Sequence, residues 1–170
     1  MGILRKLFGN NESETSKPKC EPMSVYAPVV GTVISLSAYP DDVFSQGIMG
    51  KGCGILPSEE LVTAPFNGTI VAISDTLHAV GIQSDDGVEV LIHVGVDTVC
   101  MNGNGFKYHV KEGQRVCLGD PLIEFDRETI KNAGYSDAVA VLVTNSFDYA
   151  DVELKMEGTV TNSDIILKIR

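Results

Sequence analysis

The stretch HAVGIQSDDGVEVLIHV, residues 78–94, contains two runs rich in β-branched residues on either side of the turn sequence SDDG. This pattern predicts a β-hairpin. A loop of two or four residues centred on the two aspartates pairs His78 directly with His93, and a turn one residue later shifts the pairing by two. In each register the two rings share one face, with Cβ atoms about 5 Å apart as direct partners or about 7–8 Å apart as diagonal neighbours. Two imidazoles at this spacing can share a phosphoryl group, a proton or a metal ion.

The second run of the hairpin indicates which face carries the histidines. Its valines and isoleucine recur at every second position, which predicts one buried face: Val88, Val90, Ile92 and Val94. Glu89, Leu91 and His93 then point away from the core. Thr76 lies two residues before His78 and is expected to place a hydroxyl beside the pair. Isolated histidines are usually surface residues without a special role, but two that converge outside the core indicate a functional site.

The composition excludes several classes of function. A chain of 170 residues can bury one core without metal ions or disulfides. The four cysteines lack metal-ligand spacing and follow no secretory signal, so we expect reduced thiols in the cytoplasm. The net charge of −10, with only 13 lysines and arginines, argues against nucleic-acid binding and favours a basic protein partner.

The first 22 residues are expected to form a tail rather than part of the core. No apolar run is long enough to span a membrane. MGILRKLF at the start is a short amphipathic segment, which either makes peripheral contact with an anionic membrane or is a frayed terminus. Residues 9–22 are polar, contain two prolines and predict a flexible linker. The predicted folded domain therefore spans residues 23–170.

The rest of the chain predicts an all-β fold. Short β-rich runs alternate with turn residues, and APVVGT from Ala27 is repeated as APFNGT from Ala64. We expect an antiparallel β-sandwich or barrel with internal pseudo-duplication. Helix is limited to one or two short segments. One is predicted over 127–134 with Asp126 as its cap, and a shorter helical turn is expected within 41–49.

From about Val25 to the C-terminus the chain resembles the glucose-type enzyme IIA proteins of the bacterial phosphoenolpyruvate-dependent sugar phosphotransferase system. The motifs that carry the resemblance are APVVGT, PDDVFSQGIMGKG, TAPFNGTI, TLHAVGI, GVEVLIHVGVDTV, NGNGF, EGQRVCLGD and LIEFD. The resemblance implies an antiparallel β-sandwich. It also implies a cytoplasmic phosphocarrier, a phosphotransferase component that receives a phosphoryl group from phospho-HPr and passes it to the IIB cysteine of a sugar permease.

The resemblance also assigns roles to individual residues. His93 in LIHVG would be the phosphoryl acceptor, and His78 would stabilise and help transfer the group, with Thr76 as its hydrogen-bond partner. A neutral imidazole attacks phosphorus through its unprotonated nitrogen, so its other nitrogen should donate to a carbonyl, for which the resemblance nominates Gly95. His78 can donate to a phosphoryl oxygen in the transition state.

The same motifs imply a docking surface around the histidines. Its acidic residues, Asp41 and Asp97, would meet basic residues of HPr. An exposed apolar patch ringed by charge suits a brief docking contact. For two of its members, Met49 and Val99, burial statistics alone favour a place in the core equally. The apolar members are Val43, Phe44, Ile48, Met49, Leu91 and Val99. The sequence leaves open which permease is served and whether the unphosphorylated form binds regulated proteins.

Two other classes of function compete with this interpretation. A catalytic zinc site would need a third protein ligand, and His109 lies in no suitable motif. No cofactor is expected. A weak zinc site at His78 and His93, shared with a partner protein, is the alternative that the sequence leaves open. VKEGQRVCLGD, from Val110, resembles biotinyl or lipoyl carrier domains. In those domains the modified lysine lies between the two half-motifs, whereas Lys155 falls well after the glycine block and is expected to be a solvated strand residue.

Overall fold

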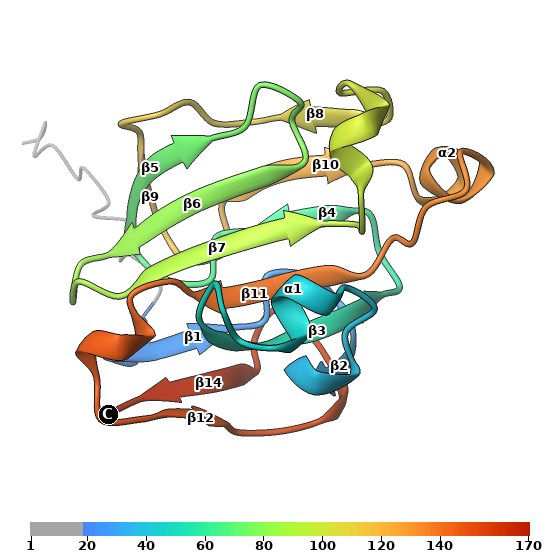
Figure 1. Cartoon of the computed structure of the whole chain (residues 1–170). Helices are drawn as coiled ribbons and strands as arrows, with labels where there is room; N and C mark the ends of the chain where they lie inside the picture. The colour runs from blue at the N-terminus through green and yellow to red at the C-terminus, as the bar shows by residue number, and fades with distance from the viewer. Residues whose placement is uncertain (1–18) are drawn as a thin grey trace, which may run out of the picture.

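The computed structural model describes residues 19–170, in which antiparallel strands form three sheets (Figure 1). The expected amphipathic segment at residues 1–8 lies outside the described residues. The largest sheet has eight strands in the order β13 (Gly158–Val160), β2 (Gly31–Ser35), β3 (Lys51–Pro57), β11 (Val139–Val143), β7 (Glu89–Val94), β6 (Ala79–Ser84), β5 (Gly68–Ile73) and β9 (Arg115–Val116). Within residues 19–170, no helix is both long and apolar enough to cross a bilayer.

Two three-stranded sheets complete the fold. One has the order β1 (Ser24–Tyr26), β14 (Ile165–Ile169) and β12 (Val152–Leu154), and the other β4 (Leu61–Thr63), β10 (Pro121–Phe125) and β8 (Phe106–Tyr108). The main core joins all three sheets, because Ile92 of β7, Ile123 of β10 and Leu167 of β14 are fully buried in one cluster. The predicted antiparallel β-sandwich is confirmed.

The repeated APxxGT motif occupies matching places in the large sheet. Gly31 begins β2 and Gly68 begins β5, and each strand pairs with the strand that follows it in the chain. A Cβ atom at either glycine would collide with a backbone carbonyl of that neighbour, at Leu56 or Gln83. The two copies therefore share one structural role, as a pseudo-duplicated fold predicts.

The predicted hairpin forms, but its register differs from each of those expected. Ser84 N–H donates to the carbonyl of Val88 at 2.8 Å, so the loop contains three residues, and Gly87 in it has φ of +88°. A three-residue loop with a left-handed glycine adds a bulge and shifts the pairing by one residue. His93 consequently lies opposite Ala79, the first residue of β6, and His78 lies in the turn before the strand.

Both predicted helical segments are present. Helix α2 (Arg127–Asn132) begins after Asp126, whose side chain accepts from Thr129 N–H, and Gly134 follows with φ of +89°. Helix α1 (Asp42–Ser45) is a single turn capped by Asp41. Three 3-10 turns, η1 (Leu36–Ala38), η2 (Thr98–Met101) and η3 (Ser146–Asp148), connect the strands.

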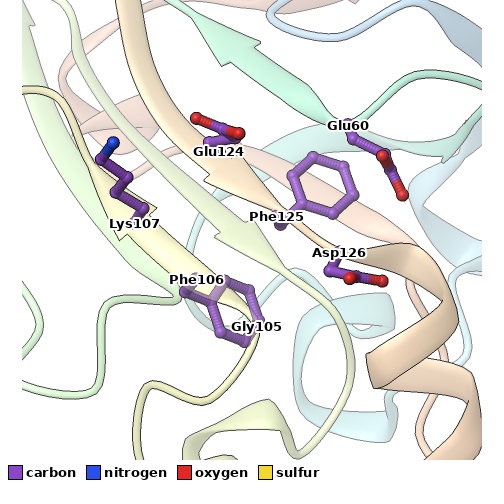
Figure 2. A pocket seen from close by; sticks show the side chains of 7 residues that line it. All are labelled: Glu60, Gly105, Phe106, Lys107, Glu124, Phe125 and Asp126. Carbon is purple, nitrogen blue, oxygen red and sulfur yellow. The ribbon is translucent and has the colours of Figure 1, made fainter.

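A pocket opens beside the sheet formed by β4, β10 and β8. Its polar lining is mainly acidic, with Lys107 the cationic side chain among the lining residues (Figure 2). The complete lining is Glu60, Gly105, Phe106, Lys107, Glu124, Phe125 and Asp126. Neither His78 nor His93 contributes to it.

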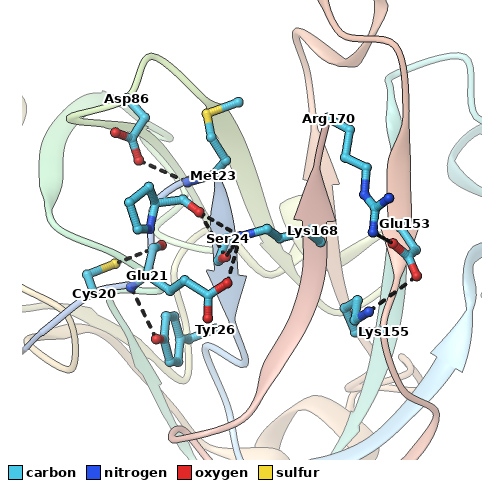
Figure 3. A network of polar contacts seen from close by, with 11 residues as sticks. Cys20, Glu21, Met23, Ser24, Tyr26, Asp86, Glu153, Lys155, Lys168 and Arg170 are labelled. Carbon is cyan, nitrogen blue, oxygen red and sulfur yellow. Dashed lines mark hydrogen bonds and ion pairs between the residues drawn. The ribbon is translucent and has the colours of Figure 1, made fainter.

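The start of the described chain is tied to the end of the sandwich (Figure 3). Lys168 Nζ of β14 lies 2.7 Å from Glu21 Oε1 and 2.9 Å from the carbonyl of Pro22, and Met23 N–H donates to Asp86 at 3.0 Å. The linker expected over residues 9–22 lies mostly outside the described residues, and these contacts hold its last residues against the folded unit.

Candidate functional site

The two histidines face each other at one end of β6 and β7. Their ring centroids are 4.7 Å apart and their planes meet at 82°, an edge-to-face arrangement. His93 is the second-last residue of β7 and is partly exposed, whereas His78 is 6% exposed. The predicted convergence is confirmed even though the predicted register was wrong, because His78 lies outside the regular alternation of β6.

The orientation of His93 is fixed by the backbone two residues later. Its Nδ1 lies 2.8 Å from the carbonyl oxygen of Gly95. A carbonyl only accepts, so Nδ1 carries the proton and Nε2 keeps its lone pair. Gly95 has φ of +82°, and a Cβ there would collide with Thr98 and the carbonyl of Ser136. The position therefore requires glycine on both conformational and steric grounds.

His78 is held by a hydroxyl group on its other side. Thr76 Oγ1 lies 2.7 Å from His78 Nδ1. When this hydroxyl donates to Nδ1, the imidazole proton resides on Nε2, where it can serve as a donor to a bound anion. The sequence predicted this hydroxyl, and the structure places it within hydrogen-bond distance.

Both imidazoles are biased toward their neutral forms. The pKa of His93 is lowered to about 4, mainly by burial and then by the proximity of His78, while the hydrogen bond with the Gly95 backbone and the charges of Asp41 and Asp97 act in the opposite direction. Burial also lowers the pKa of His78, against a smaller opposite effect from the backbone of Thr76. A neutral His93 near pH 7 has the free lone pair that nucleophilic attack needs.

A small second core supports the site from the outer face of the large sheet. Tyr39, Ala138, Ala140 and Leu142 are buried there, and Phe44 packs on them. The Phe44 ring contacts the His93 ring edge to face, with centroids 5.0 Å apart. Tyr39 O–H donates to the carbonyl of Ala138 at 2.8 Å. No local sequence pattern points to Tyr39, because its hydrogen-bond partner lies 99 residues away in the chain.

The predicted docking surface is partly apolar and open to solvent. Val43, Ile48, Met49 and Val99 are 51%, 63%, 43% and 50% exposed. The alternative placement of Met49 and Val99 in the core is therefore excluded. Leu91 and Phe44 are partly buried at its base.

The two acidic residues of this surface differ in their local roles. Asp97 is exposed. The Asp41 carboxylate accepts from the N–H groups of Val43 and Phe44 at 2.8 and 3.1 Å, so it also orders the turn that carries the apolar residues. The sequence predicted a charge for partner binding at Asp41 but not this capping role.

The structure also bears on the two competing interpretations. Across residues 19–170, no group of three or more His, Cys, Asp or Glu side chains is arranged to hold a metal ion. Lys155 donates its N–H to Ile166 of β14 at 2.8 Å, and its Nζ lies 3.3 Å from Glu153. Lys155 is exposed, as expected for a solvated residue, but it directly follows the last residue of β12 and does not lie within the strand.

Comparisons with known proteins agree with this geometry. The sequence model of the family described as phosphoenolpyruvate-dependent sugar phosphotransferase system, EIIA 1, matches residues 23–149. The chain is 45% identical over 145 residues to the PTS system beta-glucoside-specific EIIBCA component of Bacillus subtilis (strain 168), covering 85% of this chain but 24% of that protein. The structure matches glucose permease IIA from Mycoplasma capricolum with a TM-score of 0.78 and 34% identity, over 85% of this chain and 93% of that chain.

The chain thus spans about a quarter of the length of the Bacillus relative and nearly all of the solved IIA structure. The family match covers both histidines, Thr76 and the predicted docking surface. The chain therefore belongs to the EIIA family of the phosphoenolpyruvate-dependent sugar phosphotransferase system, whose members act in phosphotransfer during sugar uptake.

Proposed function

We propose that His93 accepts a phosphoryl group from phospho-HPr on Nε2 and passes it to the IIB cysteine of a sugar permease. The observation that carries this proposal is the contact between His93 Nδ1 and the carbonyl of Gly95, because it leaves the lone pair of Nε2 unused. In acceptance, the bond from phosphorus to HPr breaks as the bond from Nε2 to phosphorus forms. In donation, the Nε2–phosphorus bond breaks as the cysteine sulfur attacks.

His78 acts on the phosphoryl group without bonding covalently to it. With its proton on Nε2, it donates a hydrogen bond to an equatorial oxygen in the transition state of transfer to IIB, where negative charge is dispersed. The 4.7 Å separation between the ring centroids supports this role, because a donor on His78 would be close to a group that His93 carries. Thr76 keeps the donor proton on the correct nitrogen through its contact at Nδ1.

The surface around the histidines supports protein partners rather than a small substrate. The Phe44 ring contacts His93, and the charges of Asp41 and Asp97 act on His93. The four apolar residues proposed to complete this surface, Val43, Ile48, Met49 and Val99, are exposed. The acidic charge of this rim, in a chain of net charge −10, favours a basic donor and would accelerate its encounter. HPr is the proposed donor, and a IIB domain is the proposed acceptor. The cytoplasm is the proposed compartment, because it suits the four free thiols.

A metal ion at the histidine pair would need further ligands from a bound protein. The pair supplies two nitrogen ligands, and the described residues provide no third one nearby. We therefore propose that zinc binding, where it occurs, depends on a partner and is not required for phosphotransfer.

The test is reconstitution of the first transfer. The protein is incubated with phosphoenolpyruvate, enzyme I and HPr, and the product is examined by intact-mass spectrometry before and after brief acid treatment. We expect one added phosphoryl group that is acid-labile in the wild type and absent from His93→Ala. Retention of the label in His93→Ala would overturn the assignment. Far-UV circular dichroism of the variant controls for folding, because an outward-facing side chain contributes little to the core.

A further inference from the structure

The turn that presents His78 is backbone-strained and closed by contacts at both ends. It runs over residues 74–79, where Leu77 N–H donates to the carbonyl of Ser74 at 3.1 Å and Ser74 N–H lies 3.2 Å from the carbonyl of Ala79. Leu77 has φ of +63°, a conformation that residues with a Cβ rarely adopt. A turn of this kind needs support from outside the segment.

That support includes a tyrosine from another sheet. Tyr108 is the last residue of β8, in the sheet formed by β4, β10 and β8. Its hydroxyl oxygen accepts from Ser74 N–H at 2.9 Å, and its O–H makes a short hydrogen bond to the carbonyl of Ala79. One phenol group therefore joins the first and last residues of the turn.

Ser74 links this closure to the imidazole itself. Its hydroxyl accepts from Ala79 N–H at 3.2 Å and lies 3.2 Å from the Tyr108 hydroxyl. The same oxygen lies 3.4 Å from His78 Nδ1, on the side where Thr76 also binds. Two hydroxyl groups thus face Nδ1, and both depend on the shape of the turn.

We propose that Tyr108 is a positioning residue for phosphotransfer, which acts with Ser74 to hold the His78 turn so that the imidazole proton stays on Nε2 and faces the phosphoryl group. This inference rests on the proposed function of the histidine pair. Tyr108 does not touch the reacting atoms. It fixes both ends of the turn, and the turn sets the distance between the Thr76 hydroxyl and Nδ1.

The test compares Tyr108→Phe with a matched control, Tyr149→Phe. Both tyrosines are partly buried and pack on the main core, and Tyr149 lies after η3, outside the 74–79 turn. The first readout is long-range ¹H–¹⁵N NMR of the histidine rings, which reports which nitrogen of His78 carries the proton. The second is the rate of acceptance from ³²P-labelled phospho-HPr. The third is the rate of transfer to the IIB domain of the Bacillus subtilis beta-glucoside component.

For Tyr108→Phe we expect a mixture of His78 tautomers and transfer to IIB about three- to tenfold slower, the scale of one lost hydrogen bond. Acceptance from phospho-HPr should stay within about twofold of wild type, since the contact between His93 and Gly95 is untouched. Tyr149→Phe should match the wild type in all three readouts. Ser74→Ala should repeat the tautomer change, and it carries the same test if Tyr108→Phe does not fold.

Wild-type transfer by Tyr108→Phe, or slower transfer with an unchanged His78 tautomer, would overturn the positioning role. A tautomer change without slower transfer would also overturn it. The failure of the proposed function is distinguishable, because it would appear as a wild-type protein that takes no label from phospho-HPr.

Discussion

Replacing Gly95 by alanine tests the backbone geometry that orients His93, the proposed phosphoryl acceptor. The left-handed conformation at φ of +82° costs an alanine about 1–2 kcal/mol. The new Cβ would also collide with Thr98 and with the carbonyl of Ser136, which adds about 1–3 kcal/mol of overpacking. The free energy of unfolding should therefore fall by about 2–5 kcal/mol. Relief of the collision would move the Gly95 carbonyl away from His93 Nδ1.

Gly113→Ala is the matched control, because Gly113 has φ of +85° but its added Cβ meets no atom within 4 Å. Its free energy of unfolding should fall only by the backbone strain, about 1–2 kcal/mol, and it should accept the phosphoryl group at the wild-type rate. Gly95→Ala should accept it about three- to tenfold more slowly, the scale of one hydrogen bond. Urea unfolding and single-turnover labelling with phospho-HPr measure both effects. Equal losses of stability and equal labelling rates in the two variants would show that the crowding around Gly95 does not orient His93.

Further predictions concern protonation, donation and docking. In an NMR titration His93 should titrate near pH 4. The unfolded chain binds that proton near pH 6.5, so the free energy of unfolding should decline as the pH falls from 6.5 to 4 and should keep this contribution above pH 6.5. Titration of folded His93 near pH 6.5 would contradict the argument that burial lowers its pKa. His78→Gln, which keeps a donor, should slow transfer to IIB less than His78→Ala does, and equal wild-type rates in both would remove any role for the pair. Asp97→Asn should lower the association rate with HPr and its salt dependence, whereas Met49→Ala should mainly raise the dissociation rate; stopped-flow binding at two salt concentrations separates these effects. Phosphorylation adds about −1.5 to −2 charges to the acidic rim, so an acidic or apolar partner should bind the phosphorylated form more weakly, as measured by calorimetry. Equal affinities for the two forms would exclude a regulatory switch and would support only the carrier role.

The sequence predicted the parts of the site that depend on local periodicity. Alternation along 88–94 placed Ile92 in the core and His93 outside it, and the structure confirms both. The predicted hairpin register was wrong because Gly87, with its positive φ, belongs to a three-residue loop. The sequence SDDG does not by itself determine whether the loop has two, three or four residues. The facing arrangement of the histidines was nevertheless correct, because His78 belongs to the turn before β6 and not to its alternation.

Other elements depend on contacts that are distant in the sequence. Strand β3 was not predicted, because Gly52 and Gly54 weaken its β-strand pattern. Both glycines are needed there by close approach: a Cβ at Gly52 would collide with the carbonyl of Val141, and one at Gly54 with the Tyr39 ring. The hydroxyl of Tyr108 likewise contacts a turn that lies 34 residues earlier in the chain. Only the packing of the sheets brings these groups together.

The most direct test of the account is to locate the phosphoryl group at the level of single atoms. The protein labelled uniformly with ¹⁵N is phosphorylated by phosphoenolpyruvate, enzyme I and HPr, and coupling between ³¹P and the ring nitrogens is recorded. The account predicts a single phosphorylated residue, His93, with phosphorus bonded to Nε2 and a proton retained on Nδ1, where the Gly95 carbonyl binds it. Phosphorus on Nδ1 of His93, or on either nitrogen of His78, would contradict it.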